Sequence, residues 1–236
     1  NMCLGQVKKI SRRRKPEQLE LRARTWGGRR DGAGAKKSGR RVGVPHRTRP
    51  RHAHRYPLHV TMRVVEGLPT LRERVLFGVI CNAIAAANTV AKLRGSFRVV
   101  HFSVQTNHLH LFVEAHDKDT LARGVQGLAI RIARRINGAL RSANGRRRGR
   151  VWSDRYHAHE LTTPREVRNG LVYVLQNLKK HRPTERGADV CSSAVAFDGW
   201  RELEPSTLAW LPRPRTWLAS VGWRRRGLLS IRERPT

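Results

Sequence analysis

Two apolar segments separated by only two residues constrain the fold of this 236-residue chain more than any other feature. Residues 97–105 and 108–114 are rich in β-branched and aromatic side chains, and Thr106-Asn107 joins them. So short a connection links antiparallel strands, because parallel strands need a long crossover. The sequence therefore predicts a β-hairpin near the middle of the chain.

Four further segments have the periodicity of regular secondary structure. Apolar residues alternate with polar ones along 58–65 and 155–161, as in half-buried strands. They recur at helical spacing along 70–93 and 119–140, which predicts two helices that each bury one apolar stripe.

A capping box begins one more helix. Thr163 is the N-cap, Pro164 follows at the first helical position, and Glu166 is placed to complete the box. We expect this helix to run to about Lys180. The order strand, helix, strand, strand, helix, strand, helix predicts an α+β fold in which helices cover one face of an antiparallel sheet.

The composition divides the chain into three parts. Residues 1–55 hold 18 Lys and Arg against three acidic residues, a composition that cannot bury a core, so we expect a disordered basic arm. Residues 56–182 hold the periodic elements. Residues 183–236 hold four of the six tryptophans, so part of this C-terminal extension should pack on the domain or on its ligand.

The net charge indicates a polyanionic partner. The chain has 49 Lys and Arg against 17 Asp and Glu, a formal charge of +32, although a generally basic, ribosomal-type protein would have the same balance. No apolar run approaches the roughly 20 residues that span a bilayer, and no secretory signal is evident. Cys3, Cys81 and Cys191 are far apart, as in a reducing compartment. We expect a cytoplasmic, nucleoid-associated protein without a membrane partner.

Two histidines in the predicted hairpin are the strongest candidates for chemistry. Side chains alternate along a strand, so His108 and His110 share one face while the apolar residues between and after them share the other. Paired imidazoles on an apolar strand are typical of a metal site, in which oxygen groups or a phosphate supply the other ligands. His52-Ala53-His54 has the same spacing, but it lies among arginines without strand periodicity, and we assign it no site.

The last predicted helix carries a tyrosine off its apolar face. Tyr173 shares a polar stripe with Asn169, Gly170, Asn177 and Lys180, and the small Gly170 leaves room beside it. A phenol is a weak nucleophile near neutral pH, but it can attack a phosphodiester if a metal polarises the phosphate. Asn177 could complete the metal site through its carbonyl oxygen, and Gln176 beside it is the alternative.

The motifs resemble a known family. His108-Leu109-His110 resembles the His-hydrophobe-His signature of the HUH endonucleases. Residues 155–159, 163–169 and 171–177 resemble the REP-associated branch of the single-tyrosine transposases. The resemblance covers residues 56–182, and its two motifs occur in the family's order.

This resemblance implies a ferredoxin-like sheet with the histidine pair on its open face. It implies Mg²⁺ or Mn²⁺ held by His108, His110 and Asn177, with Tyr173 as the nucleophile that cleaves and rejoins single-stranded DNA near hairpins. The implied intermediate is a 5′-phosphotyrosine that leaves a 3′-OH and needs no ATP. Tyr156 is the rival nucleophile, although its strand location favours a contact with DNA or with the core.

Basic and aromatic residues are candidate DNA contacts. Arginine and lysine would contact phosphates, and aromatic rings would stack on unpaired bases at roughly 1–3 kcal/mol per base. The set comprises Arg63, Arg146, Arg147, Arg148, Arg150, Trp152, Arg155, Tyr156 and Lys180. Trp223, which three arginines follow, has the same character.

Two alternatives to a transposase stay open on the sequence. One is a catalytically inactive, domesticated nucleic-acid-binding protein. The other is an HUH replication initiator or relaxase, which normally carries a helicase, whereas this sequence has no Gly-Lys-Ser/Thr phosphate loop. A homodimer also stays open, since relatives either split the site between two subunits or complete it in one.

Overall fold

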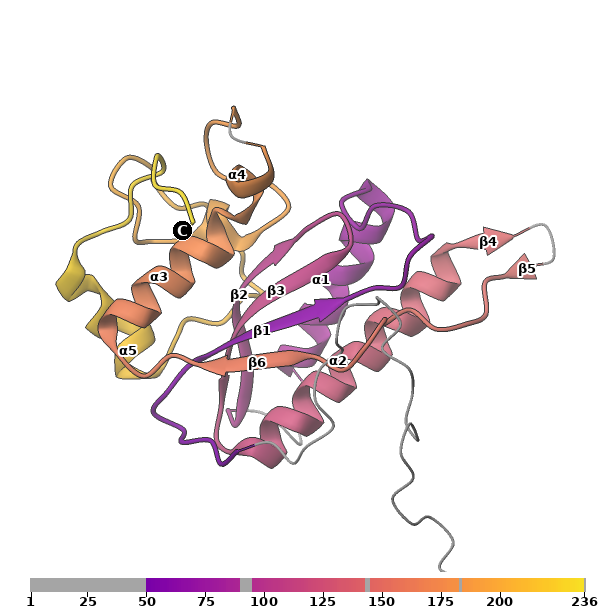
Figure 1. The fold of residues 1–236 in the computed structure, drawn as a ribbon, viewed down its shortest axis with the longest axis horizontal. Helices are drawn as coiled ribbons and strands as arrows, with labels where there is room; N and C mark the ends of the chain where they lie inside the picture. The colour runs from indigo at the N-terminus through magenta and orange to yellow at the C-terminus, as the bar shows by residue number, and fades with distance from the viewer. Residues whose placement is uncertain (1–49, 90–94, 143–144, 183, 236) are drawn as a thin grey trace, which may run out of the picture. The chain divides into compact units, whose positions relative to one another are not determined.

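Four antiparallel strands form the central sheet of the protein. The computed structural model describes residues 50–89, 95–142, 145–182 and 184–235; the predicted arm up to residue 49 lies outside these ranges. The strands run in the spatial order β2-β3-β1-β6 (Figure 1). Their bounds are β1 (Leu58–Arg63), β2 (Phe97–Val104), β3 (His108–Ala115) and β6 (His157–Glu160).

Two helices cover one face of this sheet. Helix α1 (Arg74–Thr89) connects β1 to β2, and α2 (Lys118–Ala139) follows β3, ahead of a short hairpin of β4 (Arg141–Ser142) and β5 (Gly145–Arg146). Side chains from α1, α2 and alternate strand positions form one buried cluster. The connections and the strand order are those of a ferredoxin-like fold, which confirms the predicted α+β class.

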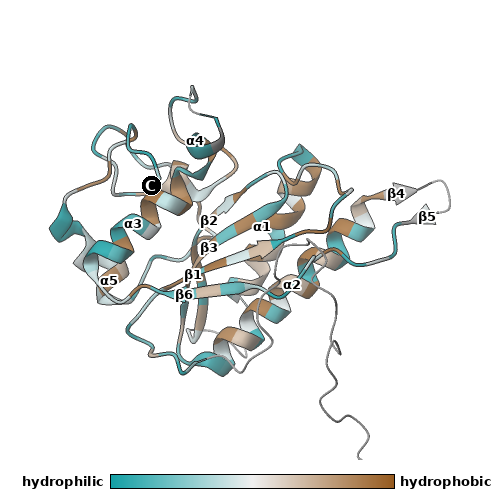
Figure 2. Ribbon diagram, viewed as in Figure 1, coloured by the Kyte–Doolittle hydropathy of each residue, from teal (hydrophilic) through white to brown (hydrophobic). Residues whose placement is uncertain are grey.

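A third helix lies against the opposite face. Helix α3 (Pro164–Leu175) begins with the predicted capping box, in which Thr163 and Glu166 each accept from the other's backbone N–H. Its apolar stripe packs on Phe112 of β3, and Figure 2 shows hydrophobic and hydrophilic residues on different sides of the helix. We expected helices on one face only; this apolar stripe brings α3 to the second face, because it needs a surface on which to be buried.

The predicted helix to Lys180 is interrupted after Leu175. Gln176 has φ −118° and ψ 17°, and a separate short helix, α4 (Asn177–His181), follows it. The Gln176 amide nitrogen donates to the carbonyl of Ser230 at 2.8 Å, and Lys179 donates to the Gln176 side-chain oxygen at 2.6 Å. These contacts hold the chain at the break, so Asn177 does not continue the helix that carries Tyr173.

The C-terminal extension folds onto α3 and the second face of the sheet. Its short helices are η2 (Ser193–Ala196), α5 (Trp217–Ser220) and η3 (Gly222–Arg226). Trp200 and Trp223 are buried in a second apolar cluster with residues of α3. The extension therefore packs on the domain. The sequence predicted that part of it would pack on the domain or on its ligand.

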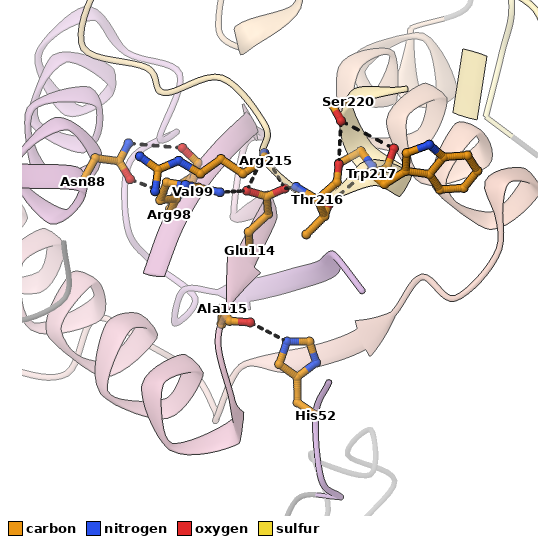
Figure 3. Close-up of polar contacts among 11 residues, drawn as sticks. His52, Asn88, Arg98, Val99, Glu114, Ala115, Arg215, Thr216, Trp217 and Ser220 are labelled. Carbon is orange, nitrogen blue, oxygen red and sulfur yellow. Dashed lines mark hydrogen bonds and ion pairs between the residues drawn. The ribbon is translucent and has the colours of Figure 1, made fainter. Parts of the chain in front are cut away.

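The end of the predicted arm also contacts the domain. His52 forms an ion pair with Glu160 and donates through Nε2 to the carbonyl of Ala115 at 2.9 Å (Figure 3). His54 stacks on His116 with ring centroids 5.7 Å apart. The two histidines at 52 and 54 thus make structural contacts, in agreement with the decision to assign them no site.

A buried histidine on β2 predicts a pH dependence of stability. Burial lowers the pKa of His101 from 6.5 to about 4, so the unfolded chain binds a proton there that the folded chain does not. The free energy of unfolding should therefore rise with pH between about 4 and 6.5, and this residue should contribute a loss of about 2 kcal/mol from pH 7 to pH 5. Urea unfolding at both pH values should show a smaller loss for His101→Leu, whereas a variant of the exposed His116 should keep the full loss. An unchanged loss in His101→Leu would contradict the assignment.

Candidate active site

Two imidazoles converge on the face of β3 that α3 approaches. The Nε2 atoms of His108 and His110 lie 3.0 Å apart. Asn107 Oδ1 lies 2.8 Å from His108 Nδ1 and can accept a proton from it, which would leave Nε2 as the atom of that ring able to bind a metal. The period-2 prediction that both rings share one face therefore agrees with the structure.

A third histidine orients the buried ring of His110. His59 on β1 has its Nε2 3.0 Å from His110 Nδ1, and Thr61 Oγ1 lies 3.3 Å from the same atom. Burial, with the nearby imidazoles of His157 and His159, lowers the pKa of His59 to about 4, so the ring is neutral near pH 7. Neutral His59 can accept from His110 Nδ1, which selects the tautomer that binds a metal through Nε2.

The sequence analysis did not select His59 as a site residue. Its signal was the alternation along β1, in which His59, Thr61 and Arg63 occupy one face. In the register of the sheet, Thr61 lies opposite His110 and Arg63 lies opposite His108. This pairing, which the sequence did not provide, places His59 beside His110.

Helix α3 brings the predicted nucleophile to these rings. The centroid of the half-buried Tyr173 ring lies 5.1 Å from that of His110 and 5.3 Å from that of His59. Lys180 of α4 places its Nζ 5.1 Å from the Tyr173 ring centroid. A phenol, a histidine pair and a cation from separate segments of one chain are thus adjacent, and no second subunit is needed to bring them together.

Asn177 is buried without a protein partner. The residue is only 1% exposed. Neither atom of its side-chain amide has a hydrogen-bond partner among the described residues. Leaving a buried amide unpaired costs about 1–3 kcal/mol, so such a group calls for a reason. A role as an oxygen ligand is one physical reason for it to be retained.

The donor atoms fit a divalent cation. The described residues contain no group of three or more His, Cys, Asp or Glu that could hold a metal. In an octahedral site, two neighbouring ligand atoms each lie about 2.1 Å from the ion and subtend a right angle at it, so the two atoms are about 3.0 Å apart. The Nε2 atoms of His108 and His110 have that separation, and His59 and Asn107 supply the orienting contacts.

A cavity of about 470 Å³ adjoins Tyr173. His59 and His159 line it from the sheet, Asn169 lines it from α3, and Arg234 lines it from the C-terminal extension. Of these four residues, Asn169 was expected on the polar stripe of Tyr173, and none was predicted as a site residue. The extension therefore contributes to the surroundings of the tyrosine, although it lies about sixty residues farther along the chain.

Gly170 has a packing role in addition to the predicted one. A Cβ on Gly170 would lie 2.8 Å from Leu161 Cδ1 and 3.7 Å from the Phe112 ring. The glycine therefore lets α3 lie close to the sheet, and it also lines the cavity beside Tyr173, as expected from its small size. Because α3 carries the tyrosine, this close approach still helps to position it.

The rival nucleophile Tyr156 lies away from the histidine pair. It packs with Trp152 against the core on the α1 and α2 side of the sheet, and both rings line a separate cavity of about 590 Å³. The Trp152 Nε1 donates to the carbonyl of Ala129 at 3.0 Å, which ties that ring to α2. The ring centroid of Tyr173, the other tyrosine weighed from the sequence, lies 5.1 Å from that of His110.

The arginines predicted to contact DNA differ in their exposure and in their hydrogen bonds. Arg63, Arg148 and Arg155 are exposed. Arg147 donates to the side chain of Asn137, and Arg150 donates to the carbonyls of Trp152 and Ser153, so these two guanidinium groups also brace their own loop. The side chain of Arg146 lies outside what the structure describes.

Comparison with known proteins gives the family. Residues 60–176 match the profile of the family described as "Transposase IS200 like", a segment that includes the histidine pair and Tyr173. The chain belongs to this IS200-like transposase family. The predicted resemblance to the single-tyrosine transposases is thereby confirmed at the level of this family.

The fold also resembles that of a solved structure. It is described as "Structure of the REP associates tyrosine transposase bound to a REP hairpin", with 14% sequence identity and a TM-score of 0.46. The match covers 58% of this chain and 74% of that chain. No curated protein matches the sequence significantly. Among the described residues, no helix has the length and hydropathy that crossing a membrane requires.

Proposed function

We propose that this protein is an HUH-type transposase that cleaves and rejoins single-stranded DNA near hairpins through Tyr173. One observation carries the proposal: the Tyr173 ring centroid lies 5.1 Å from His110, whose Nε2 lies 3.0 Å from His108 Nε2. Membership of the IS200-like transposase family supports the reaction class. The formal charge of +32 supports a nucleic-acid substrate.

The chain's residues have separate roles in this proposal. His108, His110 and Asn177 would hold Mg²⁺ or Mn²⁺, which when bound polarises the scissile phosphate and stabilises charge on its oxygens. The Tyr173 oxygen attacks phosphorus as its proton leaves, the bond to the 3′ oxygen breaks, and that oxygen takes up a proton. Lys180, beside the ring, favours the negative charge that develops on the phenol.

The products explain why no ATP is required. The 5′ phosphate is joined to Tyr173 by a phosphodiester, and the other DNA end has a free 3′-OH. Attack by a 3′-OH on this phosphotyrosine reverses the step with no net loss of phosphodiester bonds. Exposed Arg63 lies opposite His108 in the sheet, where it can contact a DNA phosphate near the histidines.

The experiment is covalent capture of a hairpin-bearing single-stranded oligonucleotide. Denaturing gels should show a protein–DNA adduct with Mg²⁺ or Mn²⁺ and none with EDTA. In His110→Ala, Mn²⁺ binding measured by calorimetry should weaken at least about tenfold, because one of two nitrogen ligands is lost. His116→Ala, which changes an exposed histidine after β3, is the control. An adduct that forms equally well in EDTA would refute the metal assignment, and strong DNA binding with no adduct in any divalent ion would favour the inactive binding protein.

A further inference from the structure

The C-terminal extension exposes a large aromatic ring. Trp217 is 48% exposed, although it begins α5 within a folded segment. The guanidinium carbon of Arg225 lies 4.9 Å from the centroid of the Trp217 ring. Trp223, which the sequence analysis selected for stacking on DNA, is instead 1% exposed. The extension thus presents a different tryptophan from the predicted one, outside the residues that match the family.

A buried carboxylate fixes the start of α5. Glu114 of β3 is 4% exposed and forms an ion pair with Arg98. It also accepts from the backbone N–H groups of Arg215 at 2.9 Å and Thr216 at 2.7 Å. Figure 3 shows the contacts of Glu114 with Arg215 and Thr216, and the indole of the next residue, Trp217, points away from Glu114. The ring is therefore held by the sheet, and little conformational entropy would be lost when it binds a ligand.

The Trp217 ring also rests on the backbone. A Cβ on Gly222 would lie 2.6 Å from the ring, so only glycine permits this approach. Neighbouring Val221 is 53% exposed. With its inner side against Gly222, the ring offers its remaining surface to solvent and to Arg225.

The charge around this ring favours a polyanion. Residues 211–226 contain five arginines and no acidic residue. Arg224 forms an ion pair with Asp198, whereas Arg213, Arg215, Arg225 and Arg226 are exposed. An exposed indole with guanidinium groups around it matches the aromatic and basic surfaces that bind single-stranded nucleic acid, in which bases stack and phosphates contact arginine.

The extension is also fixed relative to the helix of the proposed nucleophile. Leu218 and Trp223 belong to the same buried cluster as Val167 and Leu171 of α3. Because α3 carries Tyr173, a DNA strand held at Trp217 would be held on the same rigid part of the protein as the phenol.

We propose that Trp217 and Arg225 form a stacking site for an unpaired base of single-stranded DNA, with Arg213, Arg215 and Arg226 contacting its phosphates. The choice of DNA as the polyanion rests on the proposed function. The site itself is independent of catalysis, since it includes neither the histidine pair nor Tyr173.

The test measures DNA affinity in metal-free buffer by fluorescence anisotropy. The probes are a labelled oligothymidine of about 15 nucleotides, near the upper site size of single-strand binding folds, and a duplex of the same length. Trp217→Ala should weaken binding of the single strand about tenfold and leave duplex binding nearly unchanged, whereas Trp217→Phe should keep most of the affinity.

A second pair of variants separates stacking from charge. Arg225→Gln and Arg186→Gln each remove one exposed positive charge, but only Arg225 lies over the Trp217 ring. The proposal expects the larger loss of single-strand affinity in Arg225→Gln. Equal losses in the two variants, wild-type affinity in Trp217→Ala, or equal loss of single strand and duplex in Trp217→Ala would each overturn it.

The result is separable from the proposed function. Circular dichroism and thermal melting of Trp217→Ala should match the wild type, and the comparison of Arg225→Gln with Arg186→Gln tests the site if the alanine variant is unstable. Loss of single-strand affinity in Trp217→Ala without any adduct in the wild-type chain would support the stacking site and refute only the transposase chemistry. An adduct in the wild type, together with wild-type DNA affinity in Trp217→Ala, would support the transposase chemistry and refute only the stacking site.

Discussion

Replacing Tyr173 by Phe should abolish the covalent protein–DNA adduct and leave DNA binding within about twofold of the wild type. The change removes only the hydroxyl that would attack phosphorus, and a chain without the nucleophile cannot form the ester. The aromatic ring stays, so its contacts with His110 and His59 are retained. We therefore expect a loss of chemistry without a loss of the fold.

The chain permits a complete set of controls for this result. It contains only three tyrosines, Tyr56, Tyr156 and Tyr173, and a Phe variant of each tests every phenol in the protein. Denaturing gels with a hairpin-bearing single strand and Mn²⁺ should show the adduct in Tyr56→Phe and Tyr156→Phe. If the adduct persists in Tyr173→Phe and disappears in Tyr156→Phe, the nucleophile is on the other face of the sheet and the proposed site is wrong.

The features that the sequence predicted correctly depend on short-range periodicity. The two-residue connection at Thr106-Asn107 required antiparallel pairing, and β2 and β3 pair in that way. Alternation along β3 placed His108 and His110 together, because strand geometry alone decides the face. The helical phase from Thr163 placed Tyr173 off the apolar stripe. Each of these inferences uses neighbours within a few residues.

The features that the sequence did not predict depend on contacts between distant segments. His59 orients His110 only because β1 pairs with β3 in one register. The helix breaks at Gln176 because Ser230 in the C-terminal extension accepts a hydrogen bond from its side chain. Tertiary contacts of this kind override local propensity, and no local pattern announces them.

The tryptophans of the extension show the same limit. Trp217 and Trp223 lie six residues apart beside similar arginines, and composition does not distinguish them. The packing of η3 under α3 buries Trp223, while the contacts of Glu114 with Arg215 and Thr216 hold Trp217 at the surface. Which ring is available to a base is therefore decided by β3, about one hundred residues earlier in the chain.

Replacing Asn177 by Leu should make the protein more stable and less active. The Asn177 amide is buried and has no partner among the described residues, so the fold bears the cost of its desolvation. An apolar side chain of similar size removes that cost, and we expect the free energy of unfolding to rise by about 1–3 kcal/mol. If the amide oxygen is the third metal ligand, the same change should slow adduct formation at least about tenfold.

The neighbouring amide provides a control of opposite sign. Gln176 is also buried, but its side chain donates to Ser230 and accepts from Lys179, so Gln176→Leu should lower the free energy of unfolding. Urea unfolding and adduct formation measured on both variants separate the two amides. A rise in stability together with a loss of activity, in Asn177→Leu alone, is the pattern of a residue retained for ligand binding at the expense of the fold. If Asn177→Leu is instead less stable and binds Mn²⁺ as the wild type does, its amide is structural, and the third metal ligand must come from the DNA phosphate or from Gln176.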